Sequence, residues 1–259
     1  MIRCEFIKLK RKKIIHFLFI LGSLFPLVLA LLLNTPSVAL KYNSAKELYD
    51  ELYINSISFG VQFLLPAILG IFATILFFTE RDNNTFKSLR TIPVTSREMV
   101  LAKISVIFII SIFYVLVTHL VTVIFGSVFF TFNDSLNYFY ITLCNGIFIA
   151  AGTLPLIILI VVFSKSYVFS VLLTVFYTIL SFSIVPLNPI LPKAVFQLVP
   201  ITMTSFWTTG IMGKIGKVNL ENYEIKRLIP TTLNISIYMI LVGIVSIMIM
   251  VRLYERWES

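Results

Sequence analysis

Charge is scarce in this sequence: Asp, Glu, Lys and Arg together make up 13% of the 259 residues, while 58% are hydrophobic. A typical soluble domain carries about 25% charged residues, so this composition excludes an ordinary soluble protein. Cysteine is also scarce, with Cys4 near the start of the chain and Cys144 inside an apolar run. Two such distant residues exclude a disulfide framework and a cysteine-based zinc site.

Motifs for nucleotide hydrolysis and ion coupling are missing as well. The nearest approach to a phosphate-binding loop is the stretch from Gly210 to Ile215, but its first glycine is misplaced and Ile215 stands where Ser or Thr would hold Mg²⁺. The long apolar runs contain no Asp or Glu, although ion-coupled transporters usually keep an ionisable group in the membrane. We therefore expect no catalytic residue, cofactor or metal in this chain.

Long hydrophobic runs dominate what is present. Six stretches without Asp, Glu, Lys or Arg can each hold a helix of about 20 residues, enough to cross about 30 Å of hydrocarbon. This pattern predicts an all-α integral membrane protein with a single transmembrane domain over residues 1–259. The first run resembles a signal peptide, but its length and the five later runs favour a retained helix. The six expected spans are 14–33, 57–79, 104–130, 136–163, 167–187 and 231–251.

The basic residues predict how these spans are oriented. If the N-terminus is cytoplasmic, fourteen of the 21 Lys and Arg residues lie on the cytoplasmic side, as the positive-inside rule favours. Both termini are then cytoplasmic. A seventh span over 194–213 is an open alternative, because that stretch is uncharged. Its prolines and hydroxyl residues favour broken helices in the outer leaflet, within a connection over 188–230.

The first 13 residues are basic and carry an apolar stripe that includes Ile2, Phe6 and Leu9. This leader can lie in the headgroup layer as an amphipathic interfacial helix. A plain topology signal explains it equally well.

A charged segment, residues 80–99, separates the second and third expected spans. An asparagine cap and Pro93 delimit a helix of two turns. Thr95 and Glu98 then fit a capping box that starts the third span. Two turns are marginal in water, so the short helix needs a surface to pack on, either a protein partner or the lipid headgroups.

The stretch NNTFKSLRTIPVTSREM, with Glu80 before it and Lys103 after it, resembles the permease subunits of type-2 ABC exporters. It is most similar to the lantibiotic-immunity and bacitracin-resistance permeases. The resemblance implies that residues 80–99 form a coupling helix, docked in a separate cytoplasmic ABC ATPase dimer that holds ATP and Mg²⁺. It also implies a second permease copy or paralogue. The docking residues it indicates are Glu80, Thr85, Phe86, Leu89 and Arg90.

Polar side chains inside the expected spans are candidates for a substrate path. Small hydroxyl residues more often pack helices together, and a lone intramembrane histidine is more often a hydrogen-bonded packing residue. Packing and a substrate path therefore both stay open. The candidates are Thr118, His119 and Thr122 in the third span and Ser170, Thr174 and Thr178 in the fifth.

These observations and the resemblance together predict the permease subunit of an ATP-driven exporter in a bacterial cell membrane. Its substrate would be an amphipathic, membrane-active peptide such as a lantibiotic or a bacitracin-like antibiotic, and its export would give immunity or resistance. A proton-coupled transporter or channel that uses His119 and a scaffold without transport are the alternatives. The net charge of +9 gathers at the span ends, which indicates contact with membrane lipid and not with nucleic acid.

Overall fold

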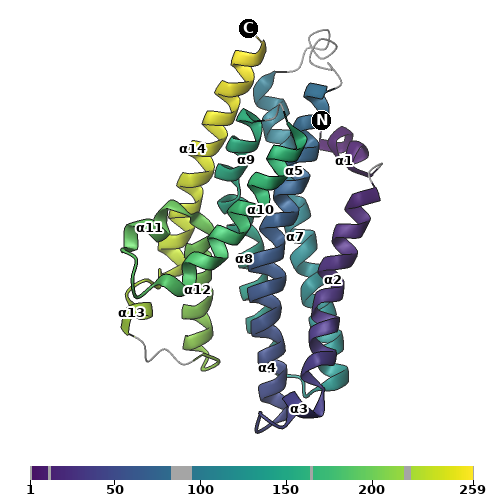
Figure 1. Ribbon diagram of the computed structural model, residues 1–259, viewed down its shortest axis with the longest axis vertical. Coiled ribbons are helices and arrows are strands. Elements are labelled where there is room, and N and C mark those ends of the chain that lie inside the picture. Colours follow the sequence, from purple (N-terminus) through teal and green to yellow (C-terminus); the bar gives the residue numbers. More distant parts are fainter. Residues whose placement is uncertain (1, 11–12, 83–94, 164–165, 219–222, 259) are drawn as a thin grey trace.

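The computed structural model describes residues 2–10, 13–82, 95–163, 166–218 and 223–258. Every regular element in these ranges is helical, which confirms the predicted all-α class (Figure 1). The elements are α1 (Ile2–Lys10), α2 (Lys13–Leu33), α3 (Pro36–Ala39), α4 (Ala45–Asn55), η1 (Ser56–Phe63), α5 (Leu64–Asp82), α7 (Ser96–Phe129), α8 (Ser135–Gly152), α9 (Leu154–Val162), α10 (Tyr167–Ile184), η2 (Val185–Leu187), α11 (Lys193–Leu198), α12 (Pro200–Lys214), α13 (Tyr223–Lys226) and α14 (Thr232–Glu258).

Five helical segments within the described ranges are long and apolar enough to cross a membrane. The described apolar part of α2, Gly22–Leu33, is shorter than these, so a sixth span over 14–33 stays a prediction. The five segments are Ala45–Phe78, Ser96–Phe129, Ser135–Val162, Tyr167–Leu187 and Thr232–Arg256.

The helices form an elongated bundle whose two ends differ (Figure 1). Helix α1 and the C-terminal end of α14 lie at one end, and α3 with the start of α4 lies at the other. The positive-inside rule predicts that the first of these ends is cytoplasmic, and we call them the terminal end and the α3 end.

Helix α4, the π-helical η1 and α5 run on as one rod, of which the segment Ala45–Phe78 has 34 residues. A rod of that length is about 51 Å long, whereas the hydrocarbon core is about 30 Å thick. Because the first turns of α4 carry Lys46, Glu47 and Asp50, we expect these turns to extend past the hydrocarbon at the α3 end, beyond the expected span of 57–79.

Two prolines mark irregular points in the spans. Pro66 has no N–H to offer the Gln62 carbonyl, and the wide turns of η1, which ends at Phe63, lie directly before it. The Tyr114 hydroxyl donates to the Gly60 carbonyl at 2.8 Å, so a carbonyl of η1 is satisfied by a neighbouring helix. Pro155 lies in the first turn of α9, where the α8–α9 segment is interrupted at Thr153.

The connection between α10 and α14 folds as broken helices, beside α8 and α14 in Figure 1. Its longest helix, α12, has 15 residues, which is shorter than the roughly 20 residues that a span requires. The predicted position in the outer leaflet stays a prediction. Trp207 of α12 is fully buried and packs edge-on against Phe148 of α8, with ring centroids 5.2 Å apart.

Candidate functional site

The helices on either side of the charged segment 80–99 are well defined. Glu80 belongs to the last turn of α5. Helix α7 starts with the predicted capping box, in which the Thr95 N–H donates to Glu98 Oε2 at 3.0 Å and the Glu98 N–H donates to Thr95 Oγ1 at 3.3 Å. The other four expected docking residues, Thr85, Phe86, Leu89 and Arg90, lie outside the described residues.

A buried ion pair joins the leader helix to these flanking helices. The Lys103 side chain on α7 is fully buried, and its ammonium group donates to Glu5 Oε2 of α1 at 3.1 Å. The same ammonium donates to the Leu76 carbonyl of α5 at 3.0 Å, and it lies 5.4 Å from the centroid of the Phe77 ring. One side chain therefore ties together α1, α5 and α7, and we call this contact the Lys103 junction.

The Lys103 junction constrains how its helices can move. Removing an ammonium and a carboxylate from water costs several kcal/mol per ion, so the loss of either group makes burial of the other less favourable. Because α5 leads into residues 83–94 and α7 leads out of them, the ends of that segment are fastened to each other and to α1. The sequence analysis had not singled out Glu5, the one acidic residue in a basic leader.

A neutral polar cluster lies in the middle of the bundle. Gln62 of η1 donates from Nε2 to Asn145 Oδ1 of α8 at 3.1 Å and to Thr208 Oγ1 of α12 at 2.9 Å. Asn145 Nδ2 also donates to Thr208 Oγ1 at 2.9 Å. All three side chains are buried, so the cluster fastens α12 to two spans. The sequence analysis missed it, although a carboxamide inside an apolar run is itself a detectable signal.

The six candidate path residues lie on two helices, α7 and α10, and all are buried. On α10, the Thr174 and Thr178 hydroxyls each donate to the carbonyl four residues earlier, both at 2.9 Å. A Cβ atom on Gly70 of α5 would lie 2.3 Å from Thr174 Cγ2, so this polar stripe, which includes Ser170, packs against α5. On α7, Thr122 Oγ1 donates to the Thr118 carbonyl at 2.8 Å. The Thr122, Thr174 and Thr178 hydroxyls therefore bond to carbonyls of their own helices, and the substrate path stays a prediction.

His119 lies on α7 against the rod of α4. Its Nδ1 atom is 2.9 Å from the Tyr53 hydroxyl, and Tyr53 stacks on Tyr138 with ring centroids 4.2 Å apart. Phe139 meets the imidazole edge-on at 5.2 Å. The described residues include no group of three or more His, Cys, Asp or Glu side chains that could hold a metal ion.

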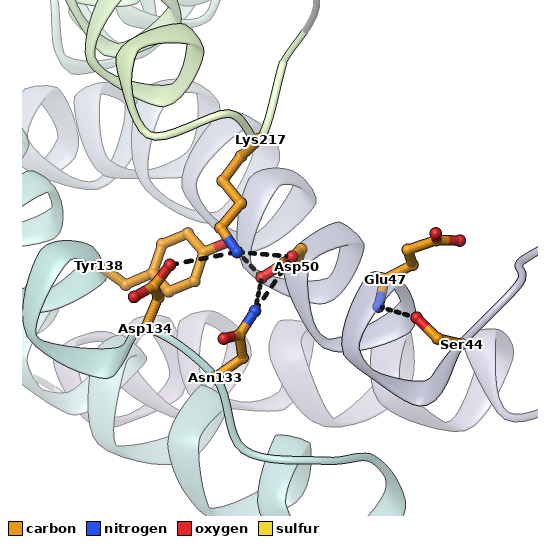
Figure 2. A network of polar contacts seen from close by, with 7 residues as sticks. All are labelled: Ser44, Glu47, Asp50, Asn133, Asp134, Tyr138 and Lys217. Atoms are coloured by element: carbon orange, nitrogen blue, oxygen red, sulfur yellow. Dashed lines mark hydrogen bonds and ion pairs between the residues drawn. The ribbon is translucent and has the colours of Figure 1, made fainter.

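A charged network connects three parts of the chain at the α3 end (Figure 2). Lys217, which follows α12, lies 2.8 Å from Asp50 Oδ2 on α4 and 3.2 Å from Asp134 Oδ2 before α8. Asp50 also accepts from Asn133 Nδ2 at 3.0 Å and from the Tyr138 hydroxyl at 2.7 Å. We call these five residues the Lys217 network.

The Lys217 network contains one cation between two carboxylates. Burial alone would lower the pKa of Lys217, but its hydrogen bonds and attraction to Asp50 and Asp134 outweigh that effect and raise the pKa above its ordinary value. Lys217 therefore stays charged at neutral pH. The network holds the C-terminal end of α12 against α4.

Five described segments are long and apolar enough to cross a membrane, so the chain is a multi-pass membrane protein. Residues 1–181, more than half of the chain, match the family described as ABC-2 family transporter protein. The chain therefore belongs to the ABC-2 family of transporter proteins and is the membrane subunit of an ABC transporter. Such subunits are generally not catalytic by themselves, and they work with an ABC ATPase. A search of curated proteins found no relative that matches this sequence.

Proposed function

We propose that this chain is the membrane subunit of an exporter that removes membrane-active peptides, such as lantibiotics or bacitracin-like antibiotics, from a bacterial cell membrane. Both termini are cytoplasmic in this proposal, and export gives immunity or resistance. The observation that carries it is the Lys103 junction, because it fastens the two helices that flank the expected coupling segment. The similarity of residues 80–99 to lantibiotic-immunity and bacitracin-resistance permeases supports the peptide substrate.

The mechanism begins at the coupling segment. A cytoplasmic ATPase dimer binds ATP and Mg²⁺ and closes. It moves the docking residues that it contacts, which are Glu80, Thr85, Phe86, Leu89 and Arg90. Helices α5 and α7 follow together because Lys103 joins them. The unbroken rod of α5, η1 and α4 then carries the displacement along the bundle to Asp50 and the Lys217 network.

The π-helical segment η1 is where this movement reaches polar groups. π-Helical turns often occur at functional sites, and Gln62 projects from η1 to Asn145 and Thr208. Displacement of the rod strains these bonds and loosens α12 from the bundle. This displacement would expose the amide and hydroxyl groups of Gln62, Asn145 and Thr208. These groups are neutral, so they suit the backbone of an amphipathic peptide better than a charged ion.

A second permease copy or paralogue completes the transporter in this proposal. The most apolar stretches of α10 and α14 are each only 22% buried within the chain, so large apolar faces are available to lipid or to a second subunit. Those faces include Leu172, Phe176, Ile240 and Ile244.

The first test is assembly with the ATPase. The chain is co-expressed with each ABC ATPase encoded beside it and extracted in mild detergent, and the ATPase that remains bound is identified. Phe86→Ala and Arg90→Ala should reduce ATPase binding, whereas Lys41→Ala, a change near the α3 end, should not. Retained binding in both coupling variants would contradict the proposed docking.

The second test is substrate specificity. Cells that express the assembled complex should survive higher concentrations of a lantibiotic or of bacitracin, and Phe86→Ala should abolish the protection. ATPase binding without any protection would favour a scaffold, while protection without an ATPase would contradict the ATP-driven mechanism.

The second candidate function is a proton-coupled transporter that uses His119. The bond between His119 and the Tyr53 hydroxyl gives the imidazole a partner deep in the bundle. If protons drive transport, His119→Gln should abolish peptide efflux from proteoliposomes energised by a pH gradient alone. The ATP-driven proposal expects no efflux under these conditions with either form of the protein.

A further inference from the structure

A cavity of about 330 Å³ lies between the first turns of α7 and the last turns of α14, at the terminal end. Its lining separates into a charged rim and an apolar floor. Arg97, Arg252 and Glu255 form the rim, and Leu101, Ile247, Met248 and Val251 form the floor.

The rim carries a net positive charge and leaves its arginines accessible. Arg97 Nε is 3.9 Å from Glu255 Oε1, and these side chains are 77% and 50% exposed. Such a long, exposed ion pair contributes little free energy. At 3.9 Å the pair is too long for a hydrogen bond, so it does not occupy the Arg97 donors. Two guanidinium groups against one carboxylate favour an anion, and their planar forks match phosphate geometry.

The sequence of α14 indicates that the cavity lies where headgroups meet hydrocarbon. The uncharged run of α14 ends at Val251, one residue before Arg252, within the longer segment Thr232–Arg256, so we expect this arginine to mark the polar boundary of α14. On the membrane side of the rim, Leu101 and Met248 are each about half exposed, at 49% and 51%. The cavity therefore offers cations at headgroup depth and an apolar surface directly beneath them.

We propose that this cavity binds one anionic phospholipid. Its phosphodiester lies between Arg97 and Arg252, and one acyl chain follows the floor past Leu101 and Met248. A free phosphate would leave the apolar floor uncovered. A zwitterionic lipid would place its own cationic group beside the two arginines of the rim, which is unfavourable. The bound lipid contacts both α7 and α14, so it stabilises the packing of these two helices. Helix α7 is the helix that follows the coupling segment.

The test uses the purified full-length chain in an uncharged detergent and native mass spectrometry. Dioctanoyl phosphatidylglycerol is titrated against dioctanoyl phosphatidylcholine and against inorganic phosphate. We expect saturable binding of one phosphatidylglycerol. Arg97→Gln and Arg252→Gln should each weaken binding about fivefold, since one basic residue near an anionic surface contributes about 1 kcal/mol. Lys193→Gln, on α11, is the charge-matched control and should bind as the unaltered protein does.

A second pair of variants tests the floor while both arginines are retained. Leu101→Trp should fill the cavity and abolish saturable binding, whereas Leu120→Trp, at another exposed position on α7, should leave it intact. Equal binding of phosphatidylcholine, or unchanged binding in both arginine variants, would overturn the proposal. Competition by inorganic phosphate together with full binding to Leu101→Trp would assign the rim to a small anion. Displacement of the lipid by the purified ATPase would assign the cavity to that protein.

Discussion

Replacing either Lys103 or Glu5 alone should destabilise the protein far more than replacing both. Lys103 is completely buried and Glu5 nearly so. Lys103→Met removes the ammonium that binds the Glu5 carboxylate, and Glu5→Leu removes the carboxylate that binds the Lys103 ammonium. Each single change should lower the free energy of unfolding by about 3–5 kcal/mol, the usual effect of removing one partner of a buried ion pair.

The double variant distinguishes ion pairing from general loss of packing. With both members of the pair replaced by apolar side chains of similar size, the cost of burying these two ions disappears together with their attraction, and such replacements are often neutral or stabilising. The Leu76 carbonyl loses the Lys103 ammonium in both Lys103→Met proteins, so that loss cancels in a double-mutant cycle. We expect a coupling free energy of at least about 2 kcal/mol between Glu5 and Lys103.

Unfolding of the purified protein by denaturing detergent in mixed micelles measures these differences, and Lys193→Met serves as an exposed control. Hydrogen exchange of the α1 amides adds a local readout, because α1 can detach before the bundle unfolds. Protection should fall in both single variants and return in the double variant. Additive single effects, with no recovery in the double variant, would refute the reasoning.

Two further predictions concern packing and the Lys217 network. Gly70→Ala should destabilise the protein by about 1–3 kcal/mol, because the new Cβ would meet Thr174 Cγ2 at 2.3 Å. Thermal unfolding measures this effect. Gly243→Ala is the control and should cause no loss of stability, since its Cβ would have its nearest neighbour at 3.8 Å. Lys217→Met should cost about 1–3 kcal/mol at neutral pH, and Lys214→Met, which removes an exposed lysine, should cost little. Despite burial, the neighbouring carboxylates raise the pKa of Lys217 above the ordinary 10.5, so its contribution to stability is complete below that pH and is lost as pH rises through the raised pKa. The difference between Lys217→Met and the unaltered protein should therefore disappear in strongly alkaline solution, and a difference that persists unchanged there would contradict the assignment to this ion pair.

The sequence was sufficient for features that depend on neighbouring residues. Transfer of apolar side chains into hydrocarbon is additive along a helix, so the helical membrane class followed from the uncharged runs. A capping box needs residues three apart, so the start of α7 at Thr95 and Glu98 was predicted correctly. The resemblance to ABC-2 permeases is confirmed at the level of the family, while the peptide-resistance subfamily, the outer-leaflet helices and the docking residues stay predictions.

The candidate path illustrates how far spacing can go. Residues four apart share a face of a helix, so the sequence correctly placed Ser170, Thr174 and Thr178 on one face. It could not determine what that face meets, because helix packing depends on the shape of both surfaces. The structure places it against Gly70 on α5.

Tertiary structure alone decided the polar contacts between distant residues. Glu5 and Lys103 are 98 positions apart, and Asp50 and Lys217 are 167 apart. Gln62, Asn145 and Thr208 come from three separate helices. Each of these groups has a high free energy when it is buried alone, and the chain can lower that energy through whichever partners helix packing brings within reach. The sequence therefore determined which segments enter the membrane, whereas the packing of those segments determined which polar side chains meet.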